Sequence, residues 1–137
     1  MARALSEAVA LVTGASRGIG RAIALELAGA GSSLLLVARN VDALDEVARE
    51  ARAAGATAET LALDLTADGA ANRVLEAATG QFGRIDLLVN NAGIAVGAPF
   101  LETGADLLRD HLRINVEVPF LLTQALVPLL TAAAHKA

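Results

Sequence analysis

Short apolar runs recur along this chain, and each is followed by a segment with the residue spacing of a helix. Buried strands are predicted at residues 8–13, 33–37, 59–63 and 85–89. The predicted helices run from 18 to 30, from Asn40 as cap to Gly55 as stop, from Thr66 as cap to about Gly83, and from Thr103 to about Ala134. Strands that alternate with helices predict an α/β fold, a doubly wound parallel sheet with helices on both faces.

The predicted sheet indicates where a ligand would bind. In doubly wound sheets, ligands bind outside the carboxyl ends of the strands, where the strand order reverses. In this chain those ends are the segments that follow Val12, Val37, Leu63 and Val89. The length fits a single domain, residues 1–137, and no internal repeat or linker divides it.

The composition argues against several kinds of chemistry. The chain has no cysteine and no tyrosine, and its histidines and only lysine are His111, His135 and Lys136. It therefore has no disulfide or thiolate, and we expect no metal site, no phenolic acid and no Schiff base. The net charge is -4 and no basic run is present, so we expect no nucleic-acid partner.

No segment of the sequence is typical of a membrane anchor or a leader. The longest uncharged run, Val118–Ala134, falls short of the ~20 apolar residues of a spanning helix. The first apolar stretch, Ala8–Val12, is too short for the core of a signal peptide. We therefore expect no membrane partner and a cytoplasmic location.

A glycine-rich turn, TGASRGIG at residues 13–20, joins the first predicted strand to the first helix. Gly14 permits a tight turn, Gly18 lets the backbone approach a diphosphate, and Gly20 lets the helix pack close to the strand. The free N–H groups and the positive end of the helix suit an anion. The alternative is an ordinary strand–helix turn, but its place between strand and helix favours a dinucleotide site.

Two arginines indicate which dinucleotide would bind. Arg39 follows the second strand, where an acidic residue would favour a free ribose 2′-hydroxyl. A guanidinium cannot accept a hydrogen bond from a hydroxyl but pairs well with a phosphate. With Arg17 in the glycine turn, it favours NADP over NAD, although exposed arginines are also common on protein surfaces.

The glycine turn, Asp64-Leu65, the run Asn90–Gly93 and Asn115 together resemble the short-chain dehydrogenase/reductase family in order and spacing. The likeness extends from Ala8 to about Leu130. It implies a Rossmann-like fold, an NADP cofactor, and hydride transfer between a nicotinamide and a small-molecule carbonyl or alcohol.

The resemblance also implies roles for single residues. Those expected at the diphosphate and adenosine are Gly14, Ser16, Arg17, Gly18 and Ile19, with Gly20 beside them. Arg39 is expected at the 2′-phosphate and Asp64 at the adenine amino group, with Leu65 beside the ring. Asn90 is expected to brace the sheet, and Asn91, Ala92 and Gly93 to line the cofactor site, the last two against the ribose.

Simpler interpretations of two of these motifs remain open. In the simpler interpretation of Asp64, this residue binds no adenine and only helps Thr66 to cap the next helix. The run Asn90–Gly93 would only form a turn, because Asn and Gly tolerate left-handed backbone conformations.

Asn115 resembles the family's helix asparagine, which helps to carry a proton relay and is therefore the catalytic candidate. Pro119 lies four residues later and has no N–H, so the carbonyl of Asn115 loses its usual helical partner. We expect that carbonyl to hold an ordered water, the alternative being a simple kink.

The family's reaction needs a serine, a tyrosine and a lysine that this chain does not supply, because it has no tyrosine and Lys136 lies in the tail. We expect a sheet truncated after the fourth strand and its following helix, and a chain that is inactive alone. The fourth strand would form an apolar edge that favours a homo-oligomer or a complementing chain. The alternatives are a non-catalytic nucleotide-binding module and a fragment that docks onto a partner.

Overall fold

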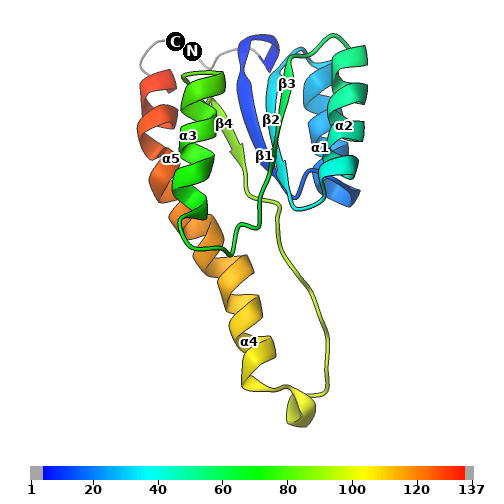
Figure 1. The fold of residues 1–137 in the computed structure, drawn as a ribbon, viewed down its shortest axis with the longest axis vertical. Coiled ribbons are helices and arrows are strands. Elements are labelled where there is room, and N and C mark those ends of the chain that lie inside the picture. The colour runs from blue at the N-terminus through cyan, green and yellow to red at the C-terminus, as the bar shows by residue number, and fades with distance from the viewer. Residues whose placement is uncertain (1–4, 135–137) are drawn as a thin grey trace.

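The computed structural model describes residues 5–134, which form an α/β fold around one parallel sheet (Figure 1). Its strands are β1 (Val9–Thr13), β2 (Ser33–Ala38), β3 (Ala58–Ala62) and β4 (Leu87–Val89). They lie in the order β3-β2-β1-β4, so the order reverses between β1 and β4. This confirms the predicted Rossmann-like, doubly wound sheet. His135 and Lys136 lie outside the described residues.

Helices cover both faces of the sheet. One layer holds α1 (Gly18–Gly29) and α2 (Val41–Ala53), and the other holds α3 (Ala70–Gln81) and α5 (Val118–Ala134) (Figure 1). Short 3-10 turns lie at η1 (Leu5–Glu7) and η2 (Phe100–Glu102), and α4 (Ala105–Leu112) continues through the π-helical segment η3 (Arg113–Glu117) into α5. The part from η2 to α4 extends away from the sheet (Figure 1).

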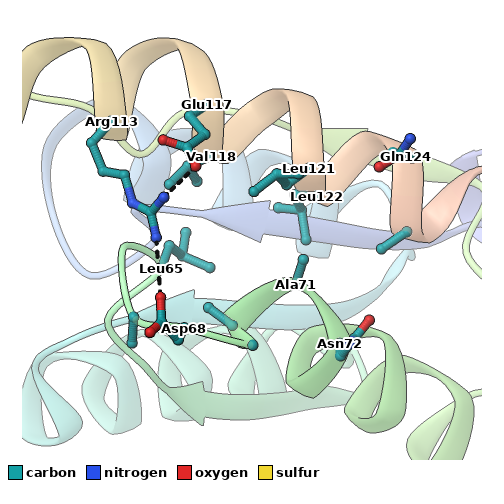
Figure 2. Close-up of a pocket in the computed structure, with 14 residues that line it drawn as sticks. Leu65, Asp68, Ala71, Asn72, Arg113, Glu117, Val118, Leu121, Leu122 and Gln124 are labelled. Atoms are coloured by element: carbon teal, nitrogen blue, oxygen red, sulfur yellow. Dashed lines mark hydrogen bonds and ion pairs between the residues drawn. The ribbon is translucent and has the colours of Figure 1, made fainter.

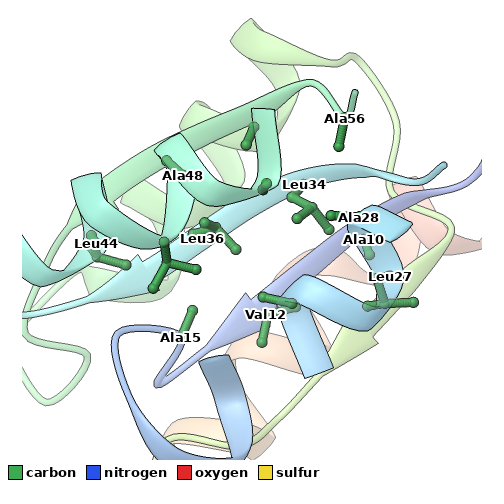
Figure 3. Close-up of a cluster of buried hydrophobic side chains, with 14 of the residues drawn as sticks. Ala10, Val12, Ala15, Leu27, Ala28, Leu34, Leu36, Leu44, Ala48 and Ala56 are labelled. Carbon is green, nitrogen blue, oxygen red and sulfur yellow. The ribbon is translucent and has the colours of Figure 1, made fainter. Parts of the chain in front are cut away.

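Two hydrophobic cores form because side chains alternate across a strand. In β1, Ala10 and Val12 pack with α1 and α2, while Val9 and Leu11 pack on the opposite face. The first core also takes buried side chains from both helices, as Figure 3 shows for Leu27. β1 is buried along its whole length, whereas β4 is only half-buried and lies at the edge of the described sheet.

Of the two helix caps predicted at Asn40 and Thr66, the structure confirms the first and not the second. The Asn40 cap is confirmed, because the N–H of Ala43 donates to its Oδ1 at 3.0 Å. The predicted cap at Thr66 is wrong: α3 begins at Ala70, and its cap is Gly69 in a left-handed conformation. The Thr66 hydroxyl donates instead to Asp64 Oδ1 at 2.7 Å, so it is not at the helix start.

The last helix extends well before the uncharged run 118–134, although it starts slightly later than predicted. It begins at Ala105 rather than at Thr103, whose hydroxyl donates to the carbonyl of Pro99 at 3.0 Å. From Ala105 to Ala134 the helix is continuous over 30 residues, with a mean hydropathy of 1.6 in its most apolar part. By length and composition this helix is sufficient to cross a membrane, whereas the uncharged run 118–134 alone is too short. Core helices of globular proteins meet the same criterion, so the helix does not by itself indicate a membrane span. The absence of a membrane partner stays a prediction.

Candidate functional site

The candidate site lies at the carboxyl ends of β1 and β4, where the strand order reverses. Two segments leave the sheet there: residues 14–17 lead into α1, and residues 90–104 lead into α4. In sheets of this kind, the space between such segments is the usual ligand crevice.

Thr13, the last residue of β1, joins the two segments. Its side chain is buried, with 1% of the residue exposed. Its hydroxyl donates to the carbonyl of Val89 at 3.2 Å and accepts from the N–H groups of Asn91 and Ala92 at 3.0 Å each. The sequence placed Thr13 in the glycine motif but assigned it no role; the signal was a threonine at the end of a buried strand.

Asn91 braces the sheet, the role that the resemblance implied for Asn90. Its Nδ2 donates to the carbonyls of Thr13 and Gly14 at 3.1 and 3.2 Å, which ties the end of β4 to β1. Asn90 instead donates to the hydroxyl of Thr123 on α5 at 3.1 Å. Both asparagines therefore hold the sheet edge together, in different directions.

The glycine turn is as tight as its sequence indicates. Gly14 has φ 63°, a left-handed value that favours glycine. A Cβ on Gly20 would lie 2.2 Å from the carbonyl oxygen of Gly14 and 2.4 Å from Asn91 Nδ2. No side chain fits at Gly20, so α1 can start directly against the end of β1.

Gly18 differs from these two glycines because the space beside it is open. It has φ 56°, and no heavy atom lies within 4 Å of the place where its Cβ would sit. Arg17 caps α1 with extended backbone and no side-chain hydrogen bond, so the first N–H groups of α1 have no side-chain partner there. Ile19, in the same turn, is 73% exposed, and Ser16 is half-buried. An open cradle of N–H groups at a helix start fits a diphosphate.

Two exposed arginines lie beyond the ends of the neighbouring strands β1 and β2, which pair with Thr13 opposite Val37. Arg17 directly precedes α1 as its N-cap, and Arg39 directly follows β2. Within residues 5–134 neither guanidinium makes a hydrogen bond or an ion pair, although the charge of Arg39 acts on Asp64. Both are therefore available to an anionic ligand.

Asp64 lies just beyond β3, near Arg39. Hydrogen bonds from the hydroxyl of Thr66, the largest cause, and from its N–H hold the pKa of this carboxyl below its ordinary value. Slight burial opposes this shift, and the charge of Arg39 adds to it. The alternative that Asp64 helps Thr66 to cap α3 is wrong, since α3 begins at Ala70. Leu65 packs into the second core, so any contact with an adenine ring would come from its backbone.

Asn115 lies in η3 and binds the segment after β4 with both ends of its amide. Its Oδ1 accepts from the N–H of Ile94 at 2.9 Å, and its Nδ2 donates to the carbonyl of Ile94 at 2.8 Å. A Cβ on Gly93 would lie 2.7 Å from Asn115 Oδ1, which explains this glycine. One turn earlier, His111 Nε2 accepts from the N–H of Val96 at 3.1 Å, a contact that the sequence gave no reason to expect.

The helix widens where Pro119 was expected to disturb it. The N–H of Val118 donates to the carbonyl of Arg113, five residues back, as in a π-helix. The π-helical turn, Arg113–Glu117, ends two residues before Pro119, so the disturbance lies around Asn115. The ordered water on the Asn115 carbonyl stays a prediction.

A cavity of about 430 Å³ lies away from this crevice, between the start of α3 and the long helix (Figure 2). Arg113 stands at its end, paired with Glu117 and Asp68 and donating to the carbonyl of Thr66 at 2.9 Å. The pairing with Glu117 raises the pKa of Arg113. Because its charge is met by protein groups, the cavity lacks a free cation for an anionic ligand. Within residues 5–134, no three His, Asp or Glu side chains are grouped to hold a metal ion.

Comparison with known proteins identifies relatives over nearly the whole chain. A family model described as short chain dehydrogenase matches residues 8–137. An uncharacterized oxidoreductase from Mycobacterium tuberculosis is 40% identical over 126 residues, which are 92% of this chain and 48% of that protein. A gluconate 5-dehydrogenase from Gluconobacter oxydans is 40% identical over 121 residues, or 88% of this chain and 47% of that protein.

Solved structures have the same fold. L-sorbose reductase from Gluconobacter frateurii, complexed with NADPH and L-sorbose, is 34% identical with a TM-score of 0.91, covering 97% of this chain and 51% of that one. A metagenomic short-chain oxidoreductase in complex with NADP is 41% identical with a TM-score of 0.86, covering 92% and 57%. The chain therefore spans about half the length of the relatives that it matches.

Proposed function

This chain belongs to the short-chain dehydrogenase family, and on that premise we propose that it is the NADP-binding portion of an oxidoreductase. The observation that carries the proposal is the start of α1. Its first N–H groups have no side-chain cap, and the space beside Gly18 is open. A diphosphate would replace water at these N–H groups without any movement of the backbone.

NADP is proposed over NAD because of the two free guanidiniums. Arg39 would pair with the 2′-phosphate, and Arg17 would add a second positive charge. Asp64 would accept a hydrogen bond from the adenine amino group, and Ile19 would have its exposed apolar surface covered by the cofactor. The complexes of two similar proteins with NADPH and NADP support this assignment.

The reaction proposed for the whole protein is hydride transfer, which the nicotinamide supplies when bound. The substrate class is a small-molecule carbonyl or alcohol. One relative is a gluconate 5-dehydrogenase and one structural neighbour is an L-sorbose reductase, which supports the class but not a particular substrate for this chain. Asn115 would act by holding Ile94 and, through its carbonyl, a water of the proton relay.

We propose further that the 137-residue chain does not catalyse the reaction unaided. It contains no tyrosine, so it has no phenol to serve as the general acid. The exposed cofactor cradle would still bind the dinucleotide. A cytoplasmic location stays a prediction.

Titration calorimetry tests the cofactor assignment. The wild-type chain should bind NADPH at least tenfold more tightly than NADH. Arg39→Gln should remove most of that difference, because the 2′-phosphate loses a charged partner worth about 1.5–3 kcal/mol. Arg49→Gln is the matched control, since Arg49 is an exposed arginine on α2, two turns beyond its start. No binding of either cofactor at millimolar concentration would refute the proposal.

A second role, association with another copy or with a complementing chain, is favoured by the exposed apolar surface of the last third. Phe100 and Leu101 are 90% and 94% exposed, and Phe120 and Val127 on α5 are 66% and 47% exposed. Such surface promotes association in water. Light scattering should show oligomers that Phe120→Ser weakens; a monomer at high concentration would exclude this role.

A further inference from the structure

The segment after β4 is held by side chains rather than by strand pairing. In the part of the chain that the structure describes, residues 92–98 make no backbone–backbone hydrogen bond. Three alternate N–H groups are instead taken by side chains: Ala92 by Thr13 Oγ1 at 3.0 Å, Ile94 by Asn115 Oδ1 at 2.9 Å, and Val96 by His111 Nε2 at 3.1 Å. Alternation is expected because an extended chain presents every second N–H to the same side.

His111 forms the outermost of these three contacts. It lies four residues before Asn115, so both side chains project from the same face of the long helix. Together they fasten residues 94 and 96 to two successive turns of that helix. The exposed residues from Val96 to Leu101 follow directly, so His111 marks the point at which the segment leaves the helix.

The partners of His111 determine its tautomer. A carbonyl oxygen only accepts, and Nδ1 lies 2.8 Å from the carbonyl oxygen of Leu107. A backbone N–H only donates, and Nε2 faces that of Val96. Nδ1 therefore carries the proton and Nε2 is the acceptor. With these two contacts the ring of His111 is a neutral imidazole in a single tautomer.

The segment that His111 fastens borders the crevice expected between β1 and β4, and forms one of its two walls. It follows Ala92 and Gly93, just beyond the carboxyl end of β4. A Cβ on Gly14 would lie 3.0 Å from Ala92 Cα, so Ala92 faces the glycine turn. The strand order reverses between β1 and β4, so a reacting ligand would lie between these two walls. Residues 94–96 follow Ala92 and Gly93 along the chain, beyond the residues proposed for the cofactor, so they are the part of this wall that remains for a substrate.

We propose that His111 is a positioning residue for the substrate side of this crevice. Its Nε2 fixes the backbone of Val96, and with Asn115 it keeps residues 94–96 at a constant distance from the long helix. The substrate role rests on the proposed function; the hydrogen bond from Val96 does not. In this role His111 acts through the segment that it holds, by its contacts with Val96 and Leu107.

Amide exchange of Val96 in the 15N-labelled chain tests this role. His111→Leu removes the acceptor at similar volume, and the Val96 N–H should exchange at least about fivefold faster, the change expected for one hydrogen bond of ~1 kcal/mol. His111→Gln should restore slow exchange, because its Oε1 is as many bonds from Cα as Nε2. The N–H of Leu36 in β2 reports the fold and should be unchanged in both variants.

Two results would overturn the proposal. One is equal exchange of Val96 in wild type and His111→Leu while Leu36 stays protected. The other is a Gln variant that exchanges as fast as the Leu variant, since that would make the ring's shape, not its acceptor, the cause. The 15N shifts of the His111 ring should also show a protonated Nδ1 and an unprotonated Nε2. The opposite tautomer would contradict the proposal.

A cofactor titration separates this proposal from the function on which its substrate role rests. NADPH affinity should change less than threefold in either variant, because the contact lies beyond the cofactor cradle. A large loss of affinity in the Leu variant that Gln does not restore would contradict the substrate-side assignment. If NADPH binds none of the three chains, the proposed function fails, while the exchange data still decide whether His111 holds Val96.

Discussion

The two segments that border the crevice are fixed by different physical means. The turn from β1 to α1 is fixed by the absence of side chains, since a Cβ on Gly20 would collide with the carbonyl of Gly14. The segment from β4 to α4 is fixed by added side chains, those of Thr13, Asn115 and His111. One wall therefore depends on close packing and the other on hydrogen bonds, so substitutions should affect them differently.

The largest effect is expected at the packed wall. Gly20→Ala places a methyl group 2.2 Å from a backbone oxygen, so α1 must shift. We expect the free energy of unfolding to fall by about 3 kcal/mol in urea denaturation. Gly80→Ala is the matched control: Gly80 lies inside α3 with open space around it, and it should stabilise by about 0.5–1 kcal/mol. Equal effects of the two changes would show that the turn is not tightly packed.

Next in size is the residue that joins both walls. Thr13→Val keeps the side-chain volume but leaves the N–H groups of Asn91 and Ala92 without their acceptor. Loss of about 2 kcal/mol is expected, from the cost of unsatisfied donors in a partly buried site. Thr13→Ser keeps the hydroxyl and should cost only about half as much. If Ser cost as much as Val, the methyl group would contribute as much as the hydroxyl, which would contradict the role assigned to these hydrogen bonds.

A smaller effect is expected on the hydrogen-bonded wall alone. Asn115→Leu removes both bonds to Ile94, and we expect a loss of about 1 kcal/mol because the site is exposed. The amides of residues 94–96 should exchange faster, while those of the glycine turn stay unchanged. Asn72→Leu on α3 is the control and should be near neutral. Faster exchange throughout the sheet would mean that the two walls are not independent.

The smallest effect concerns the titration of Asp64. Its pKa is lowered in the folded chain, so its hydrogen bonds stabilise the fold above the unfolded-state pKa, and this contribution is lost as the pH falls through the folded-state pKa. Thr66→Val removes the larger contribution and should raise the pKa of Asp64 towards its ordinary value. Thr66→Ser should not. NMR titration of the carboxyl carbon measures both, and an unchanged pKa in the Val variant would contradict the assigned cause.

The sequence predicted one wall better than the other for a physical reason. The glycine turn is local: its strand end, its glycines and the following helix are adjacent, and each leaves a recognisable pattern. The hydrogen-bonded wall joins residues that are 15 to 79 positions apart, as in Val96 with His111 and Ala92 with Thr13. Spacing within one segment gives no sign of such contacts.

Errors at the helix ends have a related cause. Asn40, Thr66 and Thr103 are all suitable caps by residue type, but only Asn40 caps its helix. The other two donate to Asp64 and to Pro99, partners in their own loops. Residue type alone does not decide between these local alternatives.

The most direct test of the account is to map where NADP+ binds on the 15N-labelled chain. The predicted result is a set of saturable amide shifts at residues 14–20, at Arg39, at Asp64-Leu65 and at residues 91–93. Amides of α3 and of the long helix beyond Glu117 should remain nearly unchanged. Shifts centred on the cavity beside Arg113, or no saturable shifts at millimolar NADP+, would contradict the claim that this half of the fold carries the cofactor site.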